Sequence, residues 1–409
     1  MISFKSPAMM AMALAVCTAA GAQPGLVVSL ASVGDRVRAQ NPDLAAARLR
    51  IREAAGRMNQ AGRLSNPQLE AGFEHNRNFR ERTFELGFSQ RFPVTDRLRL
   101  EKSVGAAELD ASEAEVREAE RLLVASARES VVKVLAIRER RELLDRQAGL
   151  AGEFAGFLRE LADKGEGSSL DAGQARLEAA GLQVSMRQLD AEEATVTGAL
   201  KPLLGMRPDE SLVVGGKLPA PVKVGQAADP AKRPDYQAAS LEVAVADRQL
   251  AVEQAKRFED LEAGIFAAAE RSEDAPDGYE TEGIVGLRVK IPLPLWDKNE
   301  GAIEEARART ERKRLEADAL ARSIRLEVGA ARAEMDEWAA LLGELDGTLI
   351  PLAEEQVAAA ENAVKNGQGE IQAVFRNREK LLQLRSSGLD ALREFNLARV
   401  RHQAALGKP

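Results

Sequence analysis

Apolar and polar residues follow two different periods along this chain. Over residues 83–92, Phe84, Leu86, Phe88 and Phe92 alternate with polar side chains, which is the two-residue period of a β-strand. Residues 68–77 alternate more loosely, and the link 76–82 between the two stretches is polar. These patterns predict a β-hairpin.

A second hairpin is predicted further along the chain. Alternation runs through 261–267 and again through 285–291, where Val285, Leu287 and Val289 are separated by polar residues or glycine. The stretch 271–283 between them is acidic and holds Pro276 and Gly278, so we expect an exposed loop there. Each strand is expected to be about ten residues long, enough to cross a bilayer when tilted.

The remaining periodicity is helical. Residues 96–162 contain no proline, and apolar residues from Met335 to Leu352 recur at alternating steps of three and four, the spacing of a coiled-coil seam. Gly347 and Pro351 lie inside that seam and are expected to kink or break the helix. Further helices are predicted at 44–62, 170–203 and 370–405, and the stretch 208–232 is predicted to be an irregular connection.

Three landmarks recur roughly 200 residues apart, which indicates an internal duplication. Asn41-Pro42-Asp43-Leu44 returns as Arg233-Pro234-Asp235-Tyr236, and Arg91-Phe92-Pro93 returns as Lys290-Ile291-Pro292. The glycine-rich turn at 164–167 returns at 366–369. We therefore expect a first repeat over residues 23–205, a linker over 206–232 and a second repeat over 233–409.

The first 22 residues have the pattern of an export signal. Lys5 precedes a short apolar run that ends in Ala20-Gly21-Ala22, which predicts cleavage before Gln23. Cys17 is the only cysteine and lies inside this segment. Lipidation at Cys17 is the less favoured interpretation, because Val16 is a poor residue before such a cleavage site.

Four membrane-length strands cannot close a barrel, since about eight is the smallest number that does. Open strand edges are not tolerated in lipid, because their backbone groups would be unpaired. Two interpretations remain: an ordinary sheet in water, or a barrel to which several chains contribute strands. No stretch of the chain is suited to covering a sheet in water.

Composition and motifs exclude several functions. The formal charge of −7 argues against nucleic acid as a partner. His75 and His402 are the only histidines, and they lie far apart in sequence, so neither a metal site nor a metal cofactor is expected. No nucleophile–base set and no cofactor-binding loop is visible, so we expect no catalytic residues and no enzyme activity.

The order of these elements resembles the TolC-type outer membrane efflux proteins. The resemblance covers nearly the whole chain after the signal segment and depends on motifs in a fixed order. These are Asn41–Leu44, Gln60–Gly62 with Asn66-Pro67, and Ile350–Glu355 ahead of the second glycine turn. Ile291-Pro292-Leu293-Pro294-Leu295-Trp296, followed by Asn299-Glu300-Gly301, is similar to the CzcC-like heavy-metal branch.

The resemblance implies a fold and an assembly. The fold is mainly α, a long α-helical barrel with four β-strands per chain, and three chains would form a 12-stranded barrel in the outer membrane of a Gram-negative bacterium. The helical barrel would extend through the periplasm. Such homotrimers are passive exit ducts that dock with a periplasmic adaptor and an inner-membrane RND transporter. Metal cations are the expected cargo.

The same resemblance assigns residues to the periplasmic tip and the membrane interface. Trp296 directly follows a predicted strand and is expected to anchor the chain at the interface. Some drug-efflux members carry an acidic ring beyond the second glycine turn, but Ala373 and Arg376 stand at those positions here. The residues expected at the tip, for gating and adaptor docking, are Gly165, Gly167, Asp171, Gly367, Gly369, Glu370 and Arg376.

Other functions remain open from the sequence. Within the same fold, the duct could export organic compounds or serve type I secretion. A protein of another class, a periplasmic adaptor or a coiled-coil scaffold, would also be rich in long helices. An adaptor, however, has one helical hairpin flanked by many short strands, and this chain has two hairpins with membrane-length strands between helices.

Overall fold

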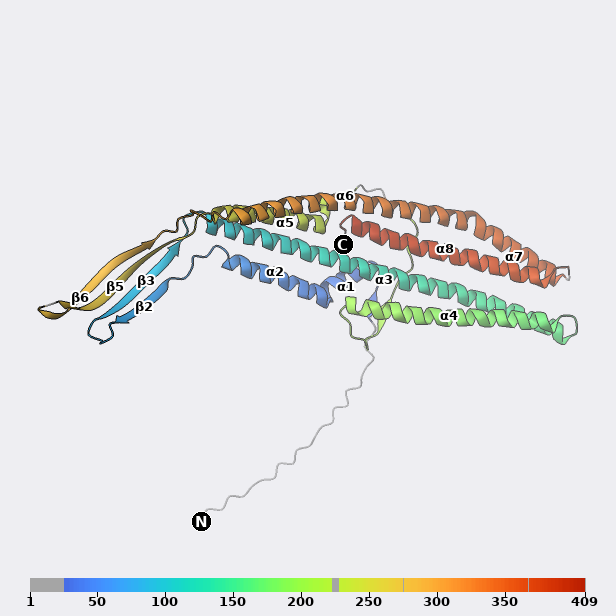
Figure 1. Ribbon diagram of the computed structural model, residues 1–409. Helices are drawn as coiled ribbons and strands as arrows, with labels where there is room; N and C mark the ends of the chain where they lie inside the picture. Colours follow the sequence, from blue (N-terminus) through green and yellow to red (C-terminus); the bar gives the residue numbers. More distant parts are fainter. Residues whose placement is uncertain (1–25, 223–227, 275, 367, 409) are drawn as a thin grey trace, which may run out of the picture.

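The chain is long and narrow, with its strands at one end and helical hairpins at the other (Figure 1). The computed structural model describes residues 26–222, 228–274, 276–366 and 368–408. The predicted signal segment, Cys17 and Gly367 lie outside the described residues.

The elements of the first half are a short strand, two helices, a hairpin of strands and two long helices. Their bounds are β1 (Leu26–Val28), α1 (Val33–Gln40), α2 (Pro42–Gln60), β2 (Gln68–His75), β3 (Arg82–Phe92), α3 (Arg97–Asp163) and α4 (Ser169–Leu203).

The second half repeats the order helix, two strands, long helix and returning helix. Its bounds are β4 (Leu212–Val214), η1 (Pro230–Lys232), α5 (Pro234–Ala255), β5 (Leu261–Asp274), β6 (Gly278–Lys290), α6 (Glu300–Glu344), η2 (Leu345–Leu349), α7 (Ile350–Lys365) and α8 (Ile371–Ala405).

Four strands form one antiparallel sheet in the order β2-β3-β5-β6, so the two predicted hairpins lie side by side. The expected exposed loop over 271–283 is wrong, because β5 and β6 pair as far as Asp274 and Gly278. Polar side chains on both faces hid this extension, but backbone pairing does not require an apolar face.

Two short strands occur in the described part besides the expected four. β4 lies in the stretch expected to be irregular and pairs in parallel with β1 near the start of the described residues. Three-residue strands are too short to show a period, so the sequence pattern could not indicate them.

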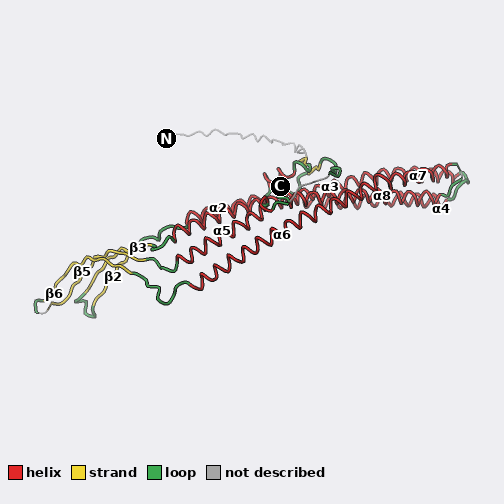
Figure 2. The backbone as a smooth tube through the Cα atoms, turned by 90° about the horizontal axis from the view of Figure 1, so that it is seen from above, coloured by secondary structure: helices red, strands yellow, loops and turns green. Residues whose placement is uncertain are grey.

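The helices form a bundle around α3, which contacts α1, α2, α4, α5 and α8 (Figures 1 and 2). Its largest apolar core lies near the middle of the molecule, where α1, α3, α4 and α8 meet the β1–β4 pair; its members include Val33, Val131, Leu200, Val214 and Val400. None of the described helices is both long enough and apolar enough to cross a lipid bilayer.

The predicted kink at Gly347 and Pro351 is a π-helical turn, η2, between α6 and α7. Pro351 has no backbone N–H to donate to a carbonyl of the preceding turn, so one helical hydrogen bond is missing. The wider turn rotates the following helix relative to α6. As a result Leu342 and Leu345 of the predicted seam are buried, whereas Leu352 is exposed and Ala353 takes its place in the core.

The two recurring starts 41–44 and 233–236 are held by different contacts, and only the first has a side-chain cap. Asn41 accepts a hydrogen bond from the Leu44 N–H at 2.8 Å. In the second copy the buried Arg233 pairs with Asp235 at 2.6 Å, and it also pairs with Glu327. Burial alone would raise the pKa of Asp235, but the hydrogen bonds and charge of Arg233 outweigh it and lower that pKa.

Candidate functional site

The four-stranded sheet has one apolar face and one polar face, set by strand register. Leu69, Phe88, Ile265 and Leu287 lie in one cross-strand row, and Ala71, Leu86, Ala267 and Val285 in the next. We call the face that carries these rows the apolar face; it extends from Phe92 to Arg82 along β3. Because successive residues of a strand point to opposite sides, the remaining residues form the polar face.

Side chains of the apolar face are exposed in the single chain. Val285 is 83% exposed and Leu287 is 81% exposed, and Leu69 and Phe73 are exposed as well. This exposed apolar surface is continuous over four strands, whereas an ordinary protein surface exposes its large apolar side chains singly or in small patches. Such a surface is suited to contact with lipid or with another protein.

The polar face carries more carboxylates than cations. Its rows place three cations, Arg91, Arg288 and Lys290, near the helices. Arg288 pairs with Glu85 at 2.9 Å, and Lys290 pairs with Glu262 at 3.2 Å. Seven glutamates share this face: Glu70, Glu74, Glu85, Glu262, Glu270, Glu280 and Glu282.

One aromatic ring covers the middle of the polar face. Phe266 lies opposite Gly286, where an added Cβ would be 2.5 Å from the ring. The Arg288 guanidinium stacks over the same ring at 4.8 Å from its centre. The glycine therefore makes room for the ring, and the ring holds a cation that also pairs with Glu85.

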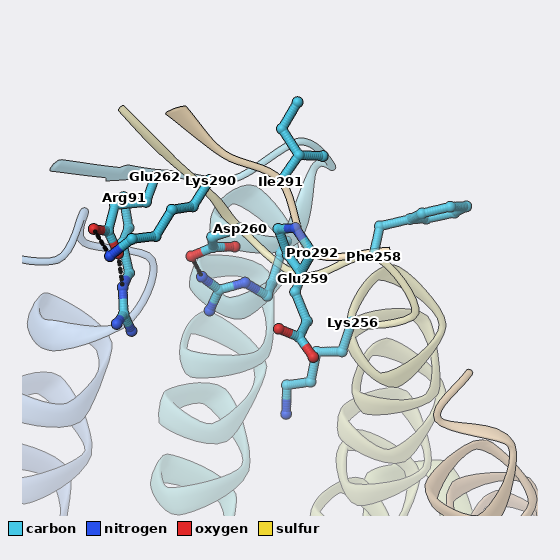
Figure 3. A pocket seen from close by; sticks show the side chains of 10 residues that line it. Arg91, Lys256, Phe258, Glu259, Asp260, Glu262, Lys290, Ile291 and Pro292 are labelled. Carbon is cyan, nitrogen blue, oxygen red and sulfur yellow. Dashed lines mark hydrogen bonds and ion pairs between the residues drawn. The ribbon is translucent and has the colours of Figure 1, made fainter. Parts of the chain in front are cut away.

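A charged cavity of about 660 Å³ lies where the sheet meets the helices (Figure 3). Arg91 and Lys290 both contact Glu262 there, and Arg97 contacts Asp260 at 2.6 Å. Burial alone would lower the pKa of Arg97, but hydrogen bonds and charges from Glu101 and Asp260 raise it. These contacts link β3, β5, β6 and the start of α3, so charge joins the sheet to the bundle.

Trp296 lies just beyond this junction and is 93% exposed. Ile291, Leu293 and Leu295 precede it and are also exposed. Its role as an interface anchor stays a prediction. Trp338, by contrast, packs partly buried against the Met335 and Phe395 cluster.

The first glycine turn has the geometry expected of a helix C-terminus. Gly165 has a φ of +77°, and the Glu166 N–H donates to the Leu161 carbonyl at 2.9 Å. Gly167 is required for a different reason, since an added Cβ would be 2.9 Å from the Leu161 Cβ.

The second turn uses the same bond, from the Gln368 N–H to the Ala363 carbonyl at 2.9 Å. Gly369 leaves no room for a side chain, because an added Cβ would be 2.8 Å from the Val364 nitrogen. Glu370 and Arg376 are exposed and Asp171 is half-buried. Asp171 lies in the first turn of α4, Glu370 directly precedes α8 and Arg376 lies near the start of α8. No contact brings them together with one another among the described residues.

A half-buried arginine near this end was not predicted from the sequence. Arg378 of α8 pairs with Glu361 of α7 at 2.6 Å and stacks over the Phe154 ring of α3 at 4.6 Å. Burial raises the pKa of Glu178 on α4, and the nearby charge of Arg378 opposes that rise. Arg378 thus contacts or faces all four helices of the two hairpins. In a chain with 57 basic residues, no sequence signal separates it from the others.

The two histidines do not form a metal site. His75 lies at the end of β2 and stacks on Phe79, whereas His402 is buried in α8. Burial lowers the pKa of His402. No group of three or more metal-ligating side chains occurs within the described ranges.

Residues 33–205 match the model of the family described as outer membrane efflux protein, which confirms the resemblance indicated by the sequence. No curated protein matches the chain in sequence. Solved structures that share the fold include the channels CusC and MtrE and the outer membrane protein VceC.

The first of these structures is CusC, studied for transmembrane channel formation, with a TM-score of 0.77 and 16% identity over 93% of this chain and 92% of that one. VceC, an outer membrane protein of Vibrio cholerae, has a TM-score of 0.74 and 18% identity over 93% and 96%. The open state of the Neisseria gonorrhoeae MtrE outer membrane channel has a TM-score of 0.72 and 15% identity over 93% and 89%. The mainly helical fold with a small sheet at one end is therefore that of outer membrane channels.

Proposed function

We propose that this chain, which matches the outer membrane efflux protein family over residues 33–205 and has the fold of its channels, is one subunit of a passive exit duct. The duct lies in the outer membrane, and its helices extend through the periplasm. The observation that carries this proposal is the two-faced sheet, apolar on one side and acidic on the other.

Three copies of the chain complete the sheet. β2 and β6 are the edge strands of the four-stranded sheet, and their outer backbone groups have no partner strand in the single chain. Pairing β2 of one copy with β6 of the next gives a closed 12-stranded barrel, which leaves no strand edge in lipid. The apolar face then contacts lipid and the polar face lines water.

The helical hairpins serve as the docking end. The α3–α4 and α7–α8 turns lie at the opposite end of the molecule from the sheet (Figure 1). Gly165, Gly167 and Gly369 belong to these turns, and Asp171, Glu370 and Arg376 lie at or near the starts of α4 and α8. A periplasmic adaptor and an inner-membrane RND transporter are the partners, and they supply the energy that a passive duct lacks.

Metal cations are the cargo that the polar face favours. Seven glutamates against three cations make its net charge negative, and a negative lining raises the local concentration of cations. The similarity of Ile291–Trp296 to the heavy-metal branch supports the same cargo.

The test begins with protein extracted by detergent from outer-membrane fractions. A heat-modifiable species with the native mass of three chains is expected, and a water-soluble monomer would instead support an adaptor or scaffold. Planar-bilayer conductance then tests cargo: we expect cation selectivity that falls when Glu270 and Glu282 are changed to glutamine. A trimer without cation selectivity would leave the duct standing and favour organic or polypeptide cargo.

A further inference from the structure

Two arginines face each other at the far end of the apolar face. Arg82 of β3 is the direct cross-strand partner of Arg271 of β5, in the last paired row of these strands away from the helices. Like charges placed directly opposite each other destabilise a sheet. Binding of a negatively charged group beside the two arginines would offset this repulsion.

The one acid of the adjacent β2–β3 turn, Glu81, accepts a hydrogen bond from Asn76 and forms no ion pair with these arginines. Among the described residues, no salt bridge involves Arg82, Arg271, or the two arginines of the adjacent β2–β3 turn, Arg77 and Arg80. The three cations of the polar face, in contrast, all pair with glutamates.

Most acids near this end belong to the other face. Glu74, Glu270 and Glu282 lie in one row of the polar face with Thr83. On the apolar side, Glu273 lies opposite Tyr279. The Tyr279 ring is 5.2 Å from the Arg271 guanidinium and holds it by a cation–π contact. At this end the two faces of the sheet therefore carry charge of opposite sign.

The distance from the arginine pair to the helix end of the strands matches the height of the apolar band of an outer-membrane barrel. The row of Phe92 and Leu261 marks the helix end of β3 and β5, and the row of Arg82 and Arg271 marks the other end. This separation corresponds to about 33 Å along the strand, or roughly 25 Å along the membrane normal at the usual strand tilt. That is the height of the apolar band of an outer-membrane barrel.

We propose that Arg82 and Arg271, with Arg77 and Arg80 beside them, bind the phosphate groups of a phosphorylated glycolipid, lipopolysaccharide, in the outer leaflet. The proposal rests on the proposed function, because it needs the apolar face to contact lipid. Guanidinium groups bind phosphate through paired, charge-assisted hydrogen bonds, and the phosphate cancels the repulsion between the two arginines. The acyl chains of the same molecule then lie on Phe84 and Ala269, in the next row.

The test uses native mass spectrometry of the detergent-solubilised trimer with lipid A as the probe. We expect wild-type protein to bind doubly phosphorylated lipid A and to bind it far better than lipid A without phosphates. Arg82→Gln with Arg271→Gln should weaken binding roughly tenfold to thirtyfold. The lysine double variant keeps the charge but not the paired hydrogen bonds, so its affinity should lie between those of the glutamine variant and the wild type. Arg50→Gln with Arg52→Gln, on exposed α2 positions, is the control of equal charge and should change nothing.

Two results would overturn this inference while leaving the duct intact. One is a trimer whose affinity for lipid A is the same with and without the two arginines. The other is complete displacement of lipid A by millimolar inorganic phosphate, which would assign the arginines to a free anion. A chain that forms no membrane-inserted trimer would instead overturn the proposed function, and with it this inference.

Discussion

The two faces of the β2-β3-β5-β6 sheet share one backbone and differ in nearly everything else. The apolar face holds rows of leucine, valine, isoleucine, alanine and phenylalanine that are exposed in the single chain. The polar face holds seven glutamates, three paired cations and one stacked aromatic ring. Because successive residues of a strand point to opposite sides, one sheet can present an apolar surface on one side and a charged surface on the other.

The largest effect is expected from a charge on the apolar face. Val285→Arg places a guanidinium at mid-height of the band and should cost about 2–4 kcal/mol in lipid, so that little trimer assembles in the membrane. Its neighbour Ile284 lies on the polar face, and Ile284→Arg should assemble nearly as the wild type does. The yield of heat-modifiable trimer in outer-membrane fractions measures both, and equal yields would contradict the assignment of faces.

The buried ion pair between Arg233 and Asp235, outside the sheet, can be compared in stability contribution with the exposed ion pairs of the polar face. Asp235→Asn leaves the buried Arg233 with Glu327 as its remaining carboxylate, at a cost of about 2 kcal/mol near neutral pH. Since the pKa of Asp235 is lowered in the folded chain, its contribution is present above the unfolded value near 4 and is lost as the pH falls further.

Thermal melting followed by helical circular dichroism at several pH values tests this contribution. The difference between wild type and Asp235→Asn should shrink as the pH falls below about 4. Asp318→Asn, at an exposed α6 position without an ion pair in the described part of the chain, should melt as the wild type does. A difference that is independent of pH would show that the lost carboxylate charge is not the cause.

A smaller effect is expected from crowding the aromatic ring on the polar face. Gly286→Ala forces the Phe266 ring to move, because the new Cβ would be 2.5 Å from it, and should cost about 1–2 kcal/mol. Gly283 lies on the other face with open space around it, so Gly283→Ala is the matched control. The temperature at which the trimer dissociates on a gel separates the two, and an unchanged midpoint for Gly286→Ala would mean that the ring is free to turn aside.

The smallest effect is expected from an exposed ion pair of the polar face. Glu85→Gln removes the partner of Arg288, yet both side chains are partly exposed and Arg288 keeps its contact with Phe266. A cost below about 1 kcal/mol is expected. The temperature at which the trimer dissociates measures this cost. A cost comparable to that of Asp235→Asn would show that water is excluded from the polar face more than the exposure of these two side chains indicates.

The strands were predictable where apolar and polar residues alternate, and not beyond. The alternation of Phe84 to Phe92 placed β3 within one residue of its observed bounds. The outer parts of β5 and β6 were mistaken for a loop, because there both faces are polar and pairing alone maintains the strand.

The tip was partly predictable. Gly165 and Gly369 stand where a left-handed residue or a close backbone approach is required, and glycine is the residue type that fits both. Arg378 was not predicted, because its contacts come from three other helices and not from its neighbours in sequence.

The sequence by itself determined the order of helices and strands, their approximate lengths and the resemblance to outer membrane efflux proteins, since these follow from local periods and turn residues. The tertiary structure alone decided which strands are neighbours, and so which charges share a face. The pairing of Arg82 with Arg271 joins residues 189 positions apart, and the polar-face row joins Glu74 to Glu270 and Glu282, 196 and 208 positions further along the chain. Register between distant strands depends on the packing of the whole chain, and no local pattern encodes it.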